Sequence, residues 1–287
     1  MASLLGHAAK PRDPTAVKKR SPKGTMSPIK MHWWRGPEGS NFGDELSPVI
    51  VRAVSGRPVE RAPIPHADML GIGSILQAAA RSPQLANRRD ALHVWGTGII
   101  TPISFPDLPC LRVSAVRGPL TRNVLRLPTN LALGDPGLLA DRLVERASSK
   151  EYAWGLIPHH SQVEEGFVQR VLAHTPRSAL IDVRHPDCLT TVLKIAACDR
   201  IASTSLHGLI VADALKIPNI WISGREQRRS FSWKFTDYFL SVGRSEFQPF
   251  PIPASGNLDD ITWSETDYFP LLDPLKAALV EAFPNLS

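Results

Sequence analysis

From Ile29 onward, short apolar runs alternate with stretches in which apolar residues recur every three or four positions. Short apolar runs between turn residues are typical of buried β-strands, and the longer spacing is typical of amphipathic helices. The strands expected in the first half are Ile29–Trp34, Ala67–Gly71, Leu92–Trp95, Leu111–Val116 and Asn130–Leu133. The helices expected between them begin at Glu45, with Asp44 as the cap and Pro48 in the first turn, and then cover Ser74–Ala80, Pro119–Leu125 and Gly137–Val144.

The same alternation starts again at the apolar run Tyr152–Ile157. Further strands are expected at Ala179–Val183, Arg200–Ala202 and Asn219–Ile222, separated by helices over 163–172, 189–196 and His207–Leu215. A final helix near Leu271–Ala282 follows a proline-rich stretch and is expected to pack back across both halves.

Strands that alternate with helices form parallel sheets with right-handed crossovers. Two such series predict an α/β fold of two Rossmann-like domains that face each other across a cleft. We expect a disordered basic tail over 1–25, an N-terminal domain over 26–146 and a C-terminal domain over 147–287, with a linker at Arg146–Lys150.

The net charge of +6 is concentrated in the first 25 residues. They hold six basic residues and one acidic residue, a net charge of +5, so the rest of the chain carries only +1. This segment is either a solvated tail or a polybasic segment that holds the protein near anionic lipid. The nearly neutral remainder does not favour a nucleic-acid partner.

Two further features predict a cytoplasmic protein. No apolar run reaches the roughly 18–20 residues of a spanning helix, and the opening Met1–Leu5 lacks the regions of a signal peptide. The three cysteines form no C-x-x-C pair and indicate reduced thiols.

Polar residues and glycines gather where the predicted strands end. Since ligands bind at the carboxyl ends of strands in open parallel sheets, their recurrence predicts a binding cleft. The clusters are Asn41–Asp44, Gly71–Ser74, Gly96–Gly98, Arg117–Pro119, Gly134–Gly137, Pro158–His160 and Ser203–Gly208.

Two of these clusters open helices and predict anion binding. Gly73 and Ser74 precede one helix, and Ser203 and Ser205 precede another, where free N–H groups and the helix dipole favour a negative charge. His207 lies in the first turn of the second helix, where a bound anion would tune it for proton transfer. The alternatives are a tight turn at the first site and a packed histidine at the second.

Other candidates also have two interpretations. Arg117 follows a strand and either binds a carboxylate or phosphate or forms an internal ion pair, for instance with Asp135. Of the adjacent His159 and His160, we expect at most one to contact a ligand, and no residue set has the spacing of a metal site. A basic loop in the C-terminal half either binds phosphate or is solvated; it holds Arg225, Arg228, Arg229 and Lys234. Three tryptophans either stack on a sugar or belong to the core: Trp33, Trp34 and Trp233.

Taken in order, the motifs N-x-G-D, G-x-G-S, W-G-T-G, R-G-P, G-D-P-G, P-H-H and S-x-S-L-H-G, across Asn41 to Gly208, resemble the polysaccharide pyruvyl transferase family. The stretch Lys234–Tyr238 resembles its bacterial exopolysaccharide branch, the succinoglycan type. The resemblance implies a two-domain, glycosyltransferase-B-like fold. It also implies transfer of the enolpyruvate unit of phosphoenolpyruvate onto a sugar, giving a cyclic pyruvate ketal and no need for a cofactor or metal.

Carried over by position, the resemblance gives His207 the role of the catalytic histidine, Arg117 that of the donor-binding arginine and Asp44 that of the acid of N-x-G-D. Ser205 stands where relatives have an arginine before L-H, so Lys234 or the Arg225–Arg229 loop is the candidate to replace its charge.

Ketal formation needs a general acid for the methylene carbon and a base for each hydroxyl. We expect His207 to act as acid and then base, and Asp44 to orient or deprotonate the sugar hydroxyl. Arg117, His159 and the helix starts would hold the donor, an electrostatic task. Asn41 and Trp33 are the candidates to bind the acceptor.

Acceptors in this family are typically lipid-linked oligosaccharides, so the resemblance implies peripheral association with the inner face of the cytoplasmic membrane. Two other functions stay open: a nucleotide-sugar-dependent glycosyltransferase of the same fold, and a non-catalytic sugar-binding relative. Retention of Arg117, His207 and Asp44 together favours an enzyme.

Overall fold

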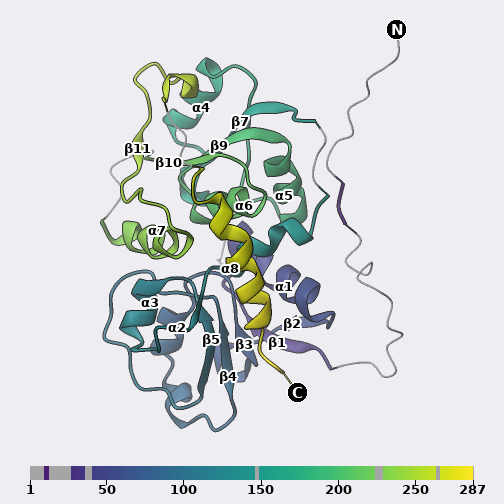
Figure 1. Cartoon of the computed structure of the whole chain (residues 1–287), viewed down its shortest axis with the longest axis vertical. Helices are drawn as coiled ribbons and strands as arrows, with labels where there is room; N and C mark the ends of the chain where they lie inside the picture. The colour runs from purple at the N-terminus through teal and green to yellow at the C-terminus, as the bar shows by residue number, and fades with distance from the viewer. Residues whose placement is uncertain are drawn as a thin grey trace.

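The computed structural model describes residues 10–12, 27–35, 41–145, 149–223, 229–262 and 266–286. It contains two β-sheets, one of six strands and one of five, that form the lower and upper halves of the molecule in Figure 1. This confirms the predicted α/β class and is consistent with two Rossmann-like domains. The expected linker includes residues 146–148, which lie outside the described residues, and the domain boundaries stay predictions.

The first sheet has the strand order β2-β1-β3-β4-β5-β6, and all its pairs are parallel. Its strands are β1 (Ile29–His32), β2 (Val59–Arg61), β3 (Met69–Leu70), β4 (Leu92–Trp95), β5 (Leu111–Val116) and β6 (Ala132–Leu133). The helices of this half are α1 (Phe42–Ser55), α2 (Leu76–Ala80) and α3 (Pro119–Val124), with 3₁₀ turns at Ile64–His66, Pro83–Asn87 and Pro136–Arg142.

The second sheet has the order β11-β10-β9-β7-β8 and is also parallel throughout. Its strands are β7 (Tyr152–Ile157), β8 (Ser178–Leu180), β9 (Cys198–Ser203), β10 (Asn219–Ser223) and β11 (Phe250–Pro251). The helices that follow β7 are α4 (Gly166–His174), α5 (Cys188–Ala196), α6 (Leu206–Ala214), α7 (Arg229–Val242) and α8 (Phe269–Glu281), with 3₁₀ turns at His160–Gln162 and Leu258–Asp260.

Two expected helices differ from the structure. Helix α1 begins at Phe42 with Asn41 as its N-cap, so Asp44 lies inside the first turn and Pro48 inside the helix. The earlier start buries Phe42, which is 1% exposed. The helix expected at Gly137–Val144 is a 3₁₀ turn over Pro136–Arg142, which the Asp135 side chain caps by accepting the Gly137 N–H.

Three elements were not expected from the sequence. Strands β2 and β11 are edge strands of three and two residues, too short for a periodic signal. Helix α7 includes Lys234, which was expected to lie in a basic loop. Residues 224–228, with Arg225 and Arg228, and the side chain of Arg229 lie outside the described part of the chain.

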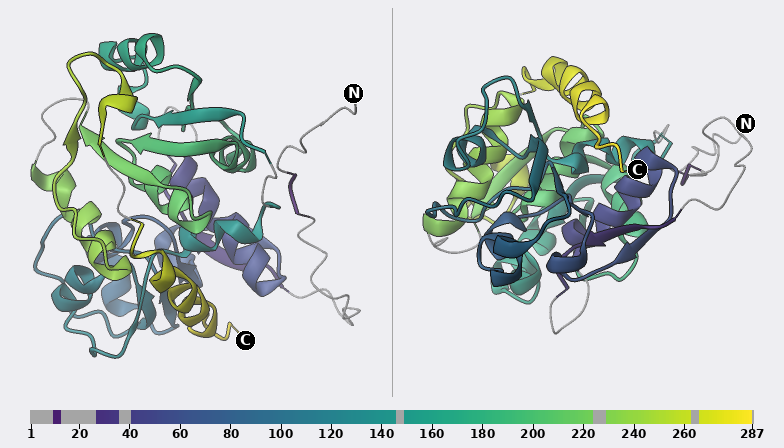
Figure 2. Two further views of the ribbon diagram at one scale, coloured as in Figure 1. Left: turned by 45° about the horizontal axis from the view of Figure 1, so that its top comes forward. Right: turned by 90° about the horizontal axis from the view of Figure 1, so that it is seen from below.

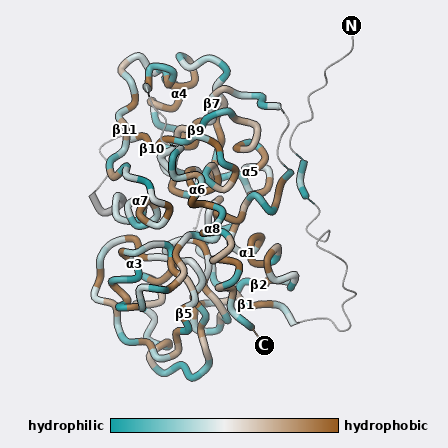
Figure 3. Tube along the Cα trace, viewed as in Figure 1, coloured by the Kyte–Doolittle hydropathy of each residue, from teal (hydrophilic) through white to brown (hydrophobic). Residues whose placement is uncertain are grey.

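Helix α6 runs through the centre of the molecule. All its residues except His207 are buried, as expected for a helix that is apolar on every side, and Figure 3 shows its hydrophobic colouring. Because β9 leads directly into α6, the sheet sets the position of the helix start and of the partly exposed His207.

The C-terminal helix α8 packs back across both halves, as expected from the sequence (Figures 1 and 2). The indole N–H of Trp95, in β4 of the first sheet, donates to the Leu279 carbonyl at 2.8 Å. One hydrophobic cluster contains residues of both sheets together with Leu272 and Leu279 of α8. The two halves therefore share a core.

Within the described residues, no helix has the length and apolar character needed to cross a bilayer. Most of the basic tail lies outside these residues. The exception is 10–12, where Pro11 forms a bridge to Val144 and the Arg12 N–H donates to the Leu143 carbonyl at 2.9 Å.

Candidate functional site

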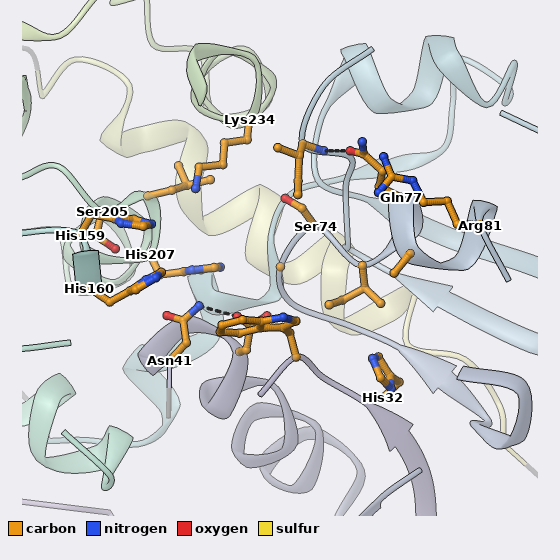
Figure 4. Close-up of a pocket in the computed structure, with 17 residues that line it drawn as sticks. His32, Asn41, Ser74, Gln77, Arg81, His159, His160, Ser205, His207 and Lys234 are labelled. Carbon is orange, nitrogen blue, oxygen red and sulfur yellow. Dashed lines mark hydrogen bonds between the residues drawn. The ribbon is translucent and has the colours of Figure 1, made fainter. Parts of the chain in front are cut away.

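A pocket of about 330 Å³ lies where the carboxyl ends of the two sheets meet. Figure 4 shows the labelled side chains converging on it from both halves. Eight residues expected at the site line it: Asn41, Asp44, Gly73, Ser74, His159, Ser205, His207 and Lys234. Among the described lining residues, Asp44 has the one carboxyl group, while Arg81 and Lys234 supply the basic side chains.

The starts of α1 and α6 meet at the floor of this pocket. A Cβ atom on Gly43 would lie 1.8 Å from the Nδ1 atom of His207, so only glycine leaves room for the imidazole. The motifs N-x-G-D and S-L-H-G therefore form one contact in space, although they lie far apart in the sequence.

Asp44 is buried, and its carboxylate accepts a hydrogen bond from the Asn41 amide at 2.5 Å. Burial raises the pKa of Asp44 to about 7, against the lowering effects of Lys234 and Asn41. Gly73, at a φ of 99°, makes room for it, since a Cβ there would lie 2.6 Å from an Asp44 oxygen. Near neutral pH this carboxyl group can therefore hold or release a proton.

His207 has the opposite protonation preference. Burial first, and then the charge of Lys234, lowers the pKa of His207 to about 3, so the imidazole is neutral in the unliganded protein. Its Nε2 atom lies 3.8 Å from the Oδ2 atom of Asp135, a fully buried carboxyl group. A neutral imidazole next to a carboxylate is suited to accept a proton.

Lys234 reaches the pocket from α7 (Figure 4). Burial, followed by repulsion from Arg117, lowers the pKa of its ammonium group to about 8, although Asp44 opposes the change. The ammonium stays mostly charged at neutral pH and supplies a cation for an anionic ligand.

Arg117 lies behind the pocket wall, not on it. Its guanidinium is fully buried and donates to the Asp237 carboxylate at 3.1 Å and to the Ser74 hydroxyl at 2.8 Å. Gly98 lies against it, where a Cβ would come within 2.5 Å of the guanidinium carbon. The ion pair is thus with Asp237 of the other half, not with Asp135, and Arg117 reaches the pocket through Ser74.

The serines before α6 have separate tasks. The Ser203 hydroxyl is buried, bonds the Ile157 carbonyl at 2.9 Å and accepts the Ser205 N–H at 2.9 Å, so it shapes the turn and does not line the pocket. Ser205 is the N-cap of α6, makes no capping bond with its own side chain and lines the pocket. Its hydroxyl is therefore available to a ligand.

The structure does not place Trp33, the tryptophan expected to bind the acceptor, in the pocket. Trp33 is 5% exposed and belongs to the core, with the Arg35 and Arg61 guanidinium groups over its ring. Trp34 is 43% exposed, lines the pocket and lies 6.3 Å from the ring of His160. Trp34, not Trp33, is therefore the tryptophan placed to contact a ligand.

Both members of the histidine pair line the pocket, and the expectation that at most one of them contacts a ligand stays a prediction. Their ring centroids lie 4.0 Å apart, and burial lowers the pKa of His159 to about 3. The His159 N–H donates to the Thr204 hydroxyl at 2.7 Å, which fixes this loop to the start of α6.

Sequence reasoning missed His32, Gln77 and Arg81 as pocket residues. Gln77 and Arg81 are four residues apart, a spacing that places them on one helix face. The Gln77 carbonyl oxygen accepts the Ile100 N–H at 3.1 Å and so ties the following loop to the pocket wall. Within the described chain, no three His, Cys, Asp or Glu side chains are grouped to hold a metal ion.

Comparisons with known proteins give two distant relatives. The chain is 26% identical over 228 residues to the succinoglycan biosynthesis protein ExoV of Rhizobium meliloti (strain 1021), covering 79% of this chain and 69% of that protein. It is 26% identical over 152 residues to the uncharacterized protein L143 of Acanthamoeba polyphaga mimivirus, covering 50% of this chain and 51% of the viral protein. No family model matches the chain, and no solved structure is significantly similar to it. The chain is thus distantly related to an exopolysaccharide biosynthesis protein.

Proposed function

We propose that this protein transfers the enolpyruvyl group of phosphoenolpyruvate onto a sugar of a bacterial exopolysaccharide or surface polysaccharide, forming a pyruvate ketal and releasing phosphate. One observation carries the proposal: a protonatable Asp44, a neutral His207 and the cation Lys234 meet in a single pocket. The relationship to a succinoglycan biosynthesis protein supports the polysaccharide context.

The donor is a small anion with a phosphate and a carboxylate. Lys234 supplies a charged contact, Ser74 and Ser205 supply hydroxyl donors, and the start of α6 supplies free N–H groups and a favourable dipole. Arg117 binds the Ser74 oxygen, which leaves the Ser74 hydrogen for the donor. We therefore assign Arg117 to holding Ser74, not to contacting the donor.

The pKa values of Asp44 and His207 assign the first proton transfer differently from the sequence interpretation. Asp44, with a pKa near 7, protonates the methylene carbon of the donor and makes its C2 atom electrophilic. A sugar hydroxyl forms a bond to C2 and gives its proton to the neutral His207. A pKa near 3 leaves His207 no proton to deliver first.

The second half of the reaction returns Asp44 and His207 to their starting protonation states. The C2–O bond to phosphate breaks, and the leaving phosphate takes the proton from the His207 imidazolium. The second sugar hydroxyl then bonds to C2 and gives its proton to the Asp44 carboxylate. One hydroxyl proton thus replaces the proton spent on the methyl group, the other leaves with phosphate, and no further reactant is needed.

The acceptor would enter past Trp34, whose exposed ring offers an apolar face to a sugar. Asn41 lies beside Asp44 and is placed to orient a hydroxyl. A lipid-linked acceptor would bring the protein to the inner face of the cytoplasmic membrane, where the basic tail would favour anionic lipid.

The test is phosphate release from phosphoenolpyruvate with galactosides, glucosides and lipid-linked oligosaccharides as acceptors. We compare the wild type with His207→Ala and with His174→Ala, an exposed histidine on α4. Acceptor-dependent release that His207→Ala lowers at least about 100-fold, and His174→Ala leaves unchanged, is the expected result. Turnover of a nucleotide sugar in place of phosphoenolpyruvate, or full activity of His207→Ala, contradicts the proposal.

A further inference from the structure

Two completely buried polar atoms face each other beneath the pocket and have no hydrogen-bond partner among the described residues: Oδ2 of Asp135 and Nε2 of His207. They lie 3.8 Å apart, longer than a hydrogen bond of about 2.8 Å. Buried polar atoms without partners are rare in native proteins, and each calls for an explanation. Catalytic hydrogen bonds are often long before the substrate binds and shorten in the complex.

Asp135 is held so that one oxygen points at His207. Its other oxygen, Oδ1, accepts the Gly137 N–H at 2.8 Å, and a backbone bond from Gly73 also favours the ionised carboxyl group. Burial, opposed by these bonds and by Arg117, raises the pKa of Asp135 to about 6, so the group is mostly a carboxylate at neutral pH. A carboxylate oxygen can only accept, which requires a proton on the facing nitrogen.

The two nitrogens of His207 have different surroundings. Nε2 is shielded from solvent, while Nδ1, next to Gly43, is not among the shielded atoms and forms no hydrogen bond with the described residues. Nδ1 is therefore the nitrogen that a ligand in the pocket can reach.

We infer that Asp135 is the positioning residue of His207: it holds the proton on Nε2 and so presents the lone pair of Nδ1 to the pocket. The catalytic consequence rests on the proposed function, but the tautomer does not. When Nδ1 takes a proton from a sugar hydroxyl, the Asp135 carboxylate stabilises the imidazolium against the positive charges of Lys234 and Arg117. Binding of the donor brings the two side chains within hydrogen-bond distance.

The substitution Asp135→Asn is expected to move the ring proton of His207 from Nε2 to Nδ1. Because Oδ1 accepts the Gly137 N–H, the amide of the variant must turn its NH₂ group toward His207. That NH₂ group donates to Nε2, and the ring proton moves to Nδ1. The variant then keeps the shape of the Asp135 side chain without its charge, but presents a protonated nitrogen to the pocket.

The experiment is ¹⁵N NMR of the imidazole nitrogens in the full-length protein at pH 7.5, with the His207 signals assigned by their loss in His207→Gln. The wild type is expected to show the Nε2–H tautomer and Asp135→Asn the Nδ1–H tautomer. Asp237→Asn, which removes another buried carboxylate that does not face His207, is the matched control and should keep the Nε2–H tautomer.

An Nδ1–H tautomer in the wild type, or the same tautomer in wild type and Asp135→Asn, overturns the inference. If the variant does not fold, the wild-type spectrum alone decides. Phosphate release by Asp135→Asn should fall about 10²–10⁴-fold, mainly in kcat. A wild type with the expected tautomer but without turnover of phosphoenolpyruvate would keep the inference and refute the proposed function.

Discussion

Asp44 is buried and His207 is mostly buried, but burial acts on the two groups in opposite directions. It raises the pKa of the carboxyl group to about 7 and lowers that of the imidazole to about 3. Both groups are therefore neutral in the unliganded pocket at slightly acid pH. Lys234 provides a positive charge to the pocket. Placing an acid and a base with such values side by side suits one pocket to both proton transfers of ketal formation.

The Asp44 carboxyl group predicts a specific pH dependence of stability. The folded-state pKa of Asp44 is raised from 3.8 to about 7, so the protonated group stabilises the folded state. This stabilisation, on the order of 4 kcal/mol, is fully present below pH 3.8 and is lost as the pH rises to 7. Asp44→Asn should therefore unfold at higher denaturant concentration than the wild type at pH 8.

At pH 5 most of this advantage of Asp44→Asn should be gone. The measurement is urea unfolding of both proteins at the two pH values, with Asp90→Asn as an exposed control. His159 and His207 titrate in all three proteins and cancel in the comparison. An equal stability difference at pH 5 and pH 8 would show that Asp44 is not buried as a carboxyl group with a raised pKa.

At the scale of elements, much of the structure follows from local sequence pattern. The strands Leu92–Trp95, Leu111–Val116 and Tyr152–Ile157 have the predicted bounds, because each is a short, mostly apolar run between turn residues. The alternation of buried and pocket-lining residues along the first strand could also have been used to predict which side chains reach the pocket. Ile29, Met31 and Trp33 are buried. The intervening His32 and Trp34 line the pocket.

Helix α7 was not predicted, because its basic residues were interpreted as part of a loop. Its buried residues Phe235, Tyr238, Phe239 and Val242 recur every three or four positions, a helical spacing. The burial of Arg117 could not be predicted in the same way. It depends on Asp237, which α7 brings in from 120 residues away.

The contact between α1 and α6 gives a prediction with a matched control. Gly43→Ala places a Cβ 1.8 Å from the His207 ring, so the ring must move. We expect a loss of about 1–3 kcal/mol in unfolding free energy and at least a tenfold loss of phosphate release. Gly166→Ala, at the start of α4 where nothing lies within 4 Å, should unfold no more easily than the wild type. Equal behaviour of the two variants would contradict the close contact between Gly43 and His207.

At the scale of the whole molecule, the two halves share a core, the helix α8 and the fully buried Arg117–Asp237 pair. The rule that ligands bind at the carboxyl ends of parallel strands predicted where the pocket lies. It could not predict that Asp135, at a turn in the first half, faces His207 of the second, because that pairing depends on how the sheets dock.

Calorimetric titration shows whether the pocket binds phosphoenolpyruvate, on which the proposed function depends. We compare the wild type with Lys234→Met, using phosphoenolpyruvate and a uridine-diphosphate hexose as ligands at pH 7. We expect one phosphoenolpyruvate site per chain, with a Kd of about 1 μM to 1 mM, at least about tenfold weaker in Lys234→Met because a charge-assisted contact is lost. Binding of the nucleotide sugar with no binding of phosphoenolpyruvate, or phosphoenolpyruvate affinity that Lys234→Met leaves unchanged, would contradict the account.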